Sequence, residues 1–402
     1  MIGASGGDFP RLRRDLAAIQ AGLRQLGLDG WLLFDVYGRN PVSGRMLGLA
    51  PMTRRYFVLI PAEGEPAALT HGIEQMPWAG WPWKKEVYVA WPELDAKLGA
   101  LLAGRRKIAM EYMPNDAVPA MDLVPGGVID LVRRCGCDVV ASGDLVTTFY
   151  AAWSDDDLAS HRRASVALAQ VAQAAFVRLA RTLAEGGSAS EGDLRDWVIA
   201  DCARHGVTVG VDCIPAIGPN AADPHYVPQG RGAPFSRGDV VLLDLWGKES
   251  ETTVYSDQTW MAYLGERVPE RVATLFAAIR DGRDAAVAYV RDAWAAKRPV
   301  QGYEVDDVCR GVVRERGWAD YFIHRTGHSI DQADHGMGPN IDNLETHETR
   351  LLLPGISFSI EPGIYIRGDV GLRTEIDVFM GPDGPEVTTP APQTEVLALY
   401  AG

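Results

Sequence analysis

Gly238-Asp-Val-Val-Leu-Leu-Asp-Leu-Trp246 has the pattern of a buried strand, and it places the acidic residue Asp244 among apolar neighbours. A second stretch, Ile356-Ser-Phe-Ser-Ile-Glu-Pro-Gly363, places Glu361 in a similar setting. Burying a lone carboxylate is costly unless it is paired or bound to a cation. These stretches therefore predict a metal site built on strands.

The segment that follows Asp244 predicts a hairpin. Strand 240–246 is followed by the polar turn 247–251, and a second apolar strand over 252–263 carries Asp257. A hairpin can set the two aspartates across from each other on one face. Two carboxylates that close repel each other unless a cation lies between them. A turn or edge position would suit Asp257 alone, but it fits Asp244 poorly.

Glu361 and Glu375 repeat this arrangement. We expect a strand over 355–361, a turn at Pro362-Gly363 and a strand over 371–379. On the last strand Arg373, Glu375 and Asp377 would share one face, because side chains alternate along a strand. The alternative is an exposed polar face with an Arg–Glu surface pair.

Histidines cluster around the apolar loop that contains His328. His324 and His335 flank it, and His225 lies in Asp223-Pro-His-Tyr226. A lone loop histidine would be structural or exposed, but this grouping favours a site. Four carboxylates and one imidazole are hard ligands that suit Mn²⁺ or Co²⁺, with Zn²⁺ and Fe²⁺ as alternatives. Two such ions about 3.5–4 Å apart can share a bridging water.

Elements before the metal segment alternate between helix and strand, which is typical of an α/β domain. A break near 151–155 precedes a long Ala-rich helix over 158–184, so we expect domains at 1–153 and 154–402. In the first domain we expect helices at 11–28, 94–102 and 128–135, and strands at 31–36, 56–61, 66–71, 107–111 and 138–141.

The composition limits the classes of partner. The net charge of -14 argues against nucleic acid and against anionic membrane surfaces. Apolar runs fall short of the roughly 18 residues of a spanning helix. The N-terminus lacks a hydrophobic signal core, which predicts a cytoplasmic protein. The five scattered cysteines predict a reduced chain without disulfides.

The order of these residues resembles the pita-bread metallopeptidases, which include methionine aminopeptidase, aminopeptidase P and prolidase, with creatinase as a metal-free relative. The resemblance is strong over 155–400, and the first 150 residues resemble the creatinase-type N-terminal domain. It implies an α+β protein with a pita-bread catalytic domain and a smaller α/β domain. The metal ligands that it implies, for two divalent ions, are Asp244, Asp257, His328, Glu361 and Glu375.

Accessory residues match the branch that cleaves next to proline. These are His225, His324, His335 and Arg373, and the resemblance implies that they take part in catalysis. It implies hydrolysis of the Xaa-Pro bond of dipeptides by a hydroxide shared between two metal ions, with Glu361 as the proton shuttle. His335 or His324 would stabilise the oxyanion, and Thr259 could orient Asp257.

Three alternatives remain open. They are an Xaa-Pro aminopeptidase that acts on longer peptides, a creatinase-type C–N hydrolase, and a binding protein that keeps the fold without catalysis. Asp244 and Asp257 lie thirteen positions apart, two more than in most relatives, and Trp260 and Gly336 also depart from the family pattern. These departures leave the five ligands intact and suggest an unusual substrate.

A dipeptidase must hold both ends of a short peptide substrate. For the proline carboxylate, Arg373, His225 and Arg350 are available. The polar loop with Asp35, Tyr37 and Arg45 is either a lid that limits substrate length or an ordinary connection. The tryptophan-rich segment 78–91 is either a packed loop or subunit contact, or a wall over the substrate. The family also implies a homodimer.

Overall fold

A computed structural model describes residues 7–209 and 212–400 of the chain. It divides into two compact units, Met1–Tyr150 and Ala151–Gly402. The sequence places this boundary at 153/154, so the two positions differ by three residues.

The first unit is built on a mixed six-stranded sheet with the strand order β4-β3-β2-β1-β5-β6. Its core combines the apolar faces of these strands with those of the long helices. The strands are β1 Gly30–Asp35, β2 Tyr56–Pro61, β3 Ala67–His71, β4 Lys84–Tyr88, β5 Lys107–Met110 and β6 Asp138–Ala141. The helices are α1 Pro10–Gln25, α2 Pro41–Leu47, α3 Trp91–Leu102, α4 Gly126–Arg134 and α5 Gly143–Phe149, with 3-10 turns at Met76–Trp78, Pro114–Asp116 and Pro119–Met121.

Among the described residues of this unit, the sequence did not predict the strand β4 or the helices α2 and α5. The helix α2 occupies much of the segment that was predicted as a polar loop. Its start is encoded locally, because Asn40 accepts a hydrogen bond from the backbone N–H of Ser43 and Pro41 takes the first helical position.

The tryptophan-rich segment packs inside the first unit. Trp78 and Trp81 are buried, and both rings lie against Phe9 with centroids 5.8 and 4.9 Å away. This supports the interpretation of the segment as a packed loop, although Trp91 is exposed.

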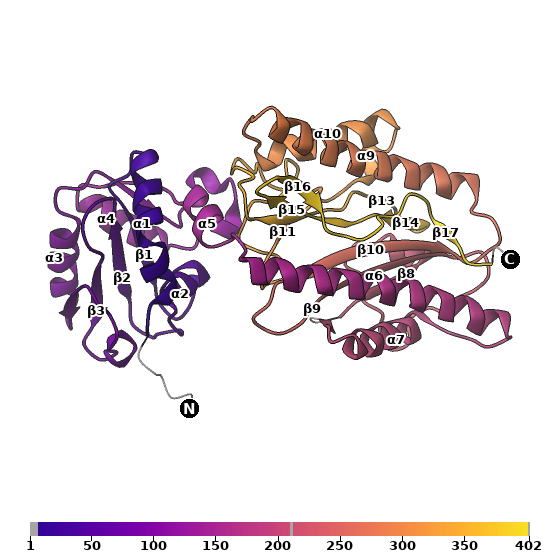
Figure 1. The fold of residues 1–402 in the computed structure, drawn as a ribbon, viewed down its shortest axis with the longest axis horizontal. Coiled ribbons are helices and arrows are strands. Elements are labelled where there is room, and N and C mark those ends of the chain that lie inside the picture. Colours follow the sequence, from indigo (N-terminus) through magenta and orange to yellow (C-terminus); the bar gives the residue numbers. More distant parts are fainter. Residues whose placement is uncertain (1–6, 210–211, 401–402) are drawn as a thin grey trace. The chain divides into compact units, whose positions relative to one another are not determined.

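In the second unit the strands lie between the helices α6 and α7 on one side and α9 and α10 on the other (Figure 1). Helix α6 packs against β9 and β10, and its buried alanines and Leu168 form one core with these strands. The helices are α6 Asp155–Ala184, α7 Glu191–Arg204, α8 Gly218–Ala221, α9 Glu270–Ala295 and α10 Gly302–Glu315, with a 3-10 turn at Ala319–Tyr321.

The strands that the structure describes in this unit form three sheets, with the orders β17-β10-β9-β7 (β8 also pairs with β9), β11-β12-β15-β16 and β13-β14. They are β7 Thr208–Val209, β8 Ile214–Ile217, β9 Val240–Lys248, β10 Ser256–Tyr263, β11 Ser329–Ile330, β12 Ser357–Ile360, β13 Gly363–Ile366, β14 Val370–Arg373, β15 Ile376–Gly381, β16 Gly384–Val387 and β17 Leu397–Ala398.

The predicted hairpin is present, but its register does not place the two aspartates directly opposite each other. Thr259 lies opposite Asp244, and Asp257 lies opposite Trp246. Asp257 is two residues from Thr259 on the same strand, so it shares a face with Asp244 as a diagonal neighbour.

The predicted single strand over 371–379 is wrong. The chain leaves β14 at Arg373 and enters β15 at Ile376, so Thr374 and Glu375 lie between strands of two different sheets. Glu375 lies at this change of partner and lines one cavity together with Asp244 and Asp257. Arg373, Glu375 and Asp377 therefore do not share one continuous strand face.

Within residues 7–209 and 212–400, no helix combines the length and the apolar composition that crossing a bilayer requires.

Candidate active site

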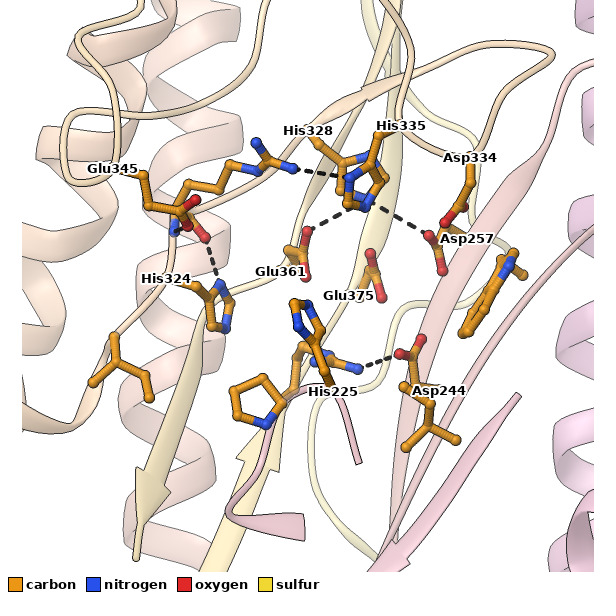
Figure 2. Close-up of a pocket in the computed structure, with 16 residues that line it drawn as sticks. His225, Asp244, Asp257, His324, His328, Asp334, His335, Glu345, Glu361 and Glu375 are labelled. Carbon is orange, nitrogen blue, oxygen red and sulfur yellow. Dashed lines mark hydrogen bonds and ion pairs between the residues drawn. The ribbon is translucent and has the colours of Figure 1, made fainter. Parts of the chain in front are cut away.

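A cavity of about 590 Å³ lies in the second unit. The five predicted metal ligands line it together with four of the predicted accessory residues, His225, His324, His335 and Arg373 (Figure 2). The two hairpins and the histidine loop thus bring side chains more than 100 positions apart in the sequence to one place. Lining residues that sequence reasoning missed are Ile214, Pro224, Trp246, Ile323, Arg325, Asp334 and Glu345.

Asp257 and Glu375 are spaced with His328 to share a cation, and Glu361 lies beside His328. One ligand atom each from Asp257, His328 and Glu375 lies within 4.8 Å of the others. The Nε2 atom of His328 is 3.6 Å from Asp257 Oδ2 and 3.5 Å from Glu361 Oε1. Asp257 Oδ1 is buried without a hydrogen-bond partner among the described residues. An orphaned carboxylate oxygen among further acidic ligands fits a divalent metal centre.

The electrostatics of the cluster also favour bound cations. Burial raises the pKa of Asp257 and Glu375 well above their usual range, and neighbouring carboxylates add to this effect. Burial raises the pKa of Asp244 to about 6 although Arg373 opposes it. Burial also acts on Glu361, but the neighbouring His328, His324, Arg373 and Arg325 together outweigh it and hold the pKa of Glu361 below its usual value. Four charges in this space therefore require positive counter-charge.

His328 is presented to the carboxylates by its backbone surroundings. At Gly327 an added Cβ would lie 1.9 Å from the carbonyl oxygen of Ser359, so only glycine permits this close approach. The Nδ1 atom of His328 is 3.1 Å from the Ser329 carbonyl oxygen. Because a carbonyl can only accept, Nδ1 carries the proton and Nε2 is left as a ligand atom.

Thr259 connects the two halves of the cluster. Its hydroxyl is 2.8 Å from Glu375 Oε2 and 3.3 Å from Asp244 Oδ1, and it accepts a hydrogen bond of 2.9 Å from Arg373 Nε. The expected contact with Asp257 is therefore wrong, because the register of the hairpin places Thr259 opposite Asp244.

We expect Thr259→Val to weaken metal binding by roughly 10- to 100-fold, since second-layer hydrogen bonds orient metal ligands. Valine keeps the volume but loses the hydroxyl, whereas Thr259→Ser keeps the hydroxyl and should bind like the parent chain. Isothermal titration of both variants with Mn²⁺ checks this, and equal affinities would show that the hydroxyl is dispensable.

Arg373 is held on the wall of the cavity by protein contacts. Its Nη2 atom pairs with Asp244 Oδ2, and Nη1 lies 3.3 Å from the hydroxyl of Tyr365. With Nε bound to Thr259, every nitrogen of the guanidinium has a partner in the protein.

Both ring nitrogens of His324 are occupied as well. Nδ1 donates to the carbonyl of Arg325 at 2.6 Å, so Nε2 accepts from the hydroxyl of Tyr365 at 2.8 Å. Burial lowers the pKa of His324 to about 4, so the ring is neutral near pH 7. His335 packs against His328, with ring centroids 4.2 Å apart.

His225 lines the cavity, and the segment that carries it is held by hydrogen bonds to Glu191. The buried carboxylate of Glu191 accepts hydrogen bonds from Ile217 N, from Ala233 N and from the hydroxyl of Tyr226. These donors bracket His225 in the sequence, so Glu191 holds the whole segment. Glu191 is a buried acidic residue at the start of helix α7, and this position was the signal for its anchoring role.

Arg350 does not line the cavity, contrary to the prediction that it binds substrate. Its buried guanidinium donates to the carboxylate of Glu348 at 2.8 and 2.6 Å and to the carbonyls of Met337 and Gly338. Arg350 therefore fixes the loop after His335 instead of meeting a ligand.

Asp35 stabilises its own turn, and a substrate contact by this residue stays a prediction. Its buried carboxylate accepts hydrogen bonds from Gly38 N and Asn40 N. Arg45 lies over the ring of Tyr150, and Tyr37 is exposed. A substrate contact by Tyr37 or Arg45 stays a prediction.

Comparison with known proteins gives the family of the chain. The model of metallopeptidase family M24 matches residues 161–382. A probable dipeptidase PepE of Mycobacterium tuberculosis is 27% identical over 381 residues, which are 92% of each chain. The crystal structure of dipeptidase PepE from Mycobacterium ulcerans aligns with a TM-score of 0.72 at 25% identity, over 98% of this chain and 99% of that one. A prolidase from Thermococcus sibiricus shares the fold, with a TM-score of 0.64 at 23% identity over 96% and 99% of the chains.

These likenesses confirm the pita-bread fold that the ligand order implied. The family match covers the segments that carry all five predicted ligands and the flanking histidines. The chain belongs to metallopeptidase family M24.

Proposed function

We propose that this chain is an Xaa-Pro dipeptidase that uses two divalent cations. The observation that carries the proposal is the convergence of the five carboxylate and imidazole ligands with His225, His324 and His335 on one cavity. Related proteins described as dipeptidase and prolidase support the substrate class. A cavity of about 590 Å³ has the size of a small-molecule site.

Asp244, Asp257, His328, Glu361 and Glu375 would hold the cations. Mn²⁺ or Co²⁺ suits this oxygen-rich set better than a metal that prefers thiolates. When bound, such a pair supplies an activated water at neutral pH and neutralises the carboxylates.

Glu361 is the residue best placed to move a proton. Its carboxylate lies beside His328, and its Oε1 accepts a hydrogen bond of 3.2 Å from Ser359 Oγ. In this role it takes a proton from the attacking water and passes it to the proline nitrogen as the peptide bond breaks.

His335 is the better candidate for stabilising the oxyanion on the scissile carbonyl. Both nitrogens of His324 are occupied by Arg325 O and Tyr365 OH, so His324 orients Tyr365 and the cavity wall. His335 keeps its Nε2 atom available for a substrate oxygen, which is the kind of donor that acyl transfer requires.

Hydrolysis of a matched substrate panel tests the proposal. With Mn²⁺ or Co²⁺ present, we expect Ala-Pro to be cleaved with a kcat/KM at least about tenfold above those of Ala-Ala and Ala-Pro-Ala, since a shaped site separates such substrates by this margin. A preference for Ala-Pro-Ala would indicate an aminopeptidase, and a preference for Ala-Ala would remove the proline specificity.

A further inference from the structure

Among the described residues that line the cavity, Arg325 and Arg373 carry a permanent positive charge. The remaining ionisable side chains of the lining are carboxylates and histidines. A dipeptide brings a free carboxylate into this acidic space, and that group needs a cation for compensation. The question is which arginine is available to provide it.

The guanidinium of Arg373 is already bound by protein groups. Its nitrogens contact Asp244, Thr259 and Tyr365, and its charge is already paired with the Asp244 carboxylate. A substrate carboxylate would have to displace this ion pair at a buried position, which is costly. Arg373 therefore serves the ligand set and is a poor receptor for substrate.

The guanidinium of Arg325, in contrast, makes few contacts with the described residues. Its Nη2 atom donates to His335 Nδ1 at 3.1 Å, shown as a dashed line to His335 in Figure 2. The ion pairs formed among the described residues do not include its guanidinium. Its backbone N–H is held by Glu345 at 2.8 Å, which fixes the residue at the cavity wall. Most of its five donors are left for a ligand.

The contact with His335 also fixes the state of that ring. Arginine can only donate, so Nδ1 of His335 must accept, and the single proton of a neutral ring is on Nε2. Arg325 thus aims an N–H of His335 away from itself. In an Xaa-Pro dipeptide the carboxylate is only a few bonds from the scissile carbonyl. If His335 donates to the oxygen of the scissile carbonyl, Arg325 therefore lies near the substrate carboxylate.

We propose that Arg325 selects substrates with a free C-terminal carboxylate next to the scissile bond, and that it positions His335. This inference rests on the proposed function, and it makes dipeptides the substrate class. A longer peptide presents an amide at this position, with its terminal charge farther away. Bidentate recognition by a planar guanidinium suits a carboxylate better than an amide.

The test compares Ala-Pro with Ala-prolinamide, which has the same length but lacks the carboxylate. In Arg325→Met we expect kcat/KM for Ala-Pro to fall about 10- to 100-fold, mainly through KM, because charge-assisted hydrogen bonds are lost. The value for Ala-prolinamide should change much less. Arg325→Lys keeps the charge and should recover part of the preference. Arg314→Met, an exposed change on α10, is the matched control.

Calorimetric binding of L-proline and L-prolinamide to the metal-loaded chain gives a readout without turnover. Tighter binding of L-proline that disappears in Arg325→Met supports the assignment. An unchanged preference in Arg325→Met, an equal loss for both ligands, or equal behaviour of the Met and Lys variants overturns it. If the parent chain cleaves neither peptide, the proposed function falls, and proline binding still decides the role of Arg325.

Discussion

Glu361→Gln is expected to lower kcat for Ala-Pro by about a thousandfold, which is within the range that positioned proton transfer contributes. Glutamine has nearly the same shape, and it can still accept the hydrogen bond from Ser359. Its amide cannot take up a proton from water and pass it on. The loss should therefore appear in kcat rather than in KM.

The measurement must separate proton transfer from metal loss, because Glu361 is also a predicted ligand. We would determine metal content by atomic absorption at saturating Mn²⁺ and compare kcat only for fully loaded protein. Glu251→Gln makes the same chemical change on an exposed turn and should leave kcat unchanged. A near-normal kcat in fully loaded Glu361→Gln would assign proton transfer to another group.

The ligand positions were predictable because the sequence places carboxylates in stretches whose apolar pattern indicates a buried strand. Asp244 and Glu361 stand out since strand patterns rarely tolerate a carboxylate. The apolar surroundings of these residues are visible without knowledge of their partners. The hydrogen-bond partners of Asp35 and Arg350 were not predictable in this way, because they are backbone groups or a residue in the same loop. Such local satisfaction depends on backbone conformation.

Register and strand ends were not predictable for a related reason. Charged and uncharged residues continue to alternate across Thr374 and Glu375, so the pattern gives no sign that the chain changes sheets there. The position of Thr259 opposite Asp244 depends on the length of the turn that closes the hairpin. A change in turn length moves each cross-strand pair without altering the sequence of either strand.

Arg325 and Asp334 were missed although they lie beside predicted histidines. Single polar residues in a loop follow no period, and an exposed position is the usual outcome for them. Their inward orientation follows from the loop between His324 and Asn340, which Ser329, Asn340 and Arg350 hold in place. This information exists only in the folded chain.

Removal of the cations is expected to abolish turnover and to lower the melting temperature of the second unit by about 10 °C. A ligand at about a thousand times its Kd stabilises a protein by about 4 kcal/mol. In a domain of this size, each kcal/mol shifts the melting temperature by roughly 2–4 °C. Thermal scans with Mn²⁺ and with EDTA measure the difference.

The difference in melting temperature between the metal-loaded and the metal-free chain should grow between pH 5 and pH 7.5. The folded-state pKa values of Asp257 and Glu375 are raised, and that of Asp244 is about 6, whereas unfolded carboxyls titrate near pH 4. Between those values the folded, metal-free chain holds more protons than the unfolded chain, so its stability falls as pH rises. Glu361, with a lowered pKa, acts in the opposite direction but is one group against three.

Bound cations take the place of those protons, so the loaded chain avoids the loss and the two melting curves separate as pH increases. Asp257→Asn removes one of the raised carboxyls and a ligand, and it should reduce both the metal effect and its pH dependence. A metal-induced shift that is constant from pH 5 to pH 7.5 would mean that these carboxylates do not bind the cation. It would place the cation elsewhere in the chain and remove the basis for the active site, because each proposed role depends on that cluster.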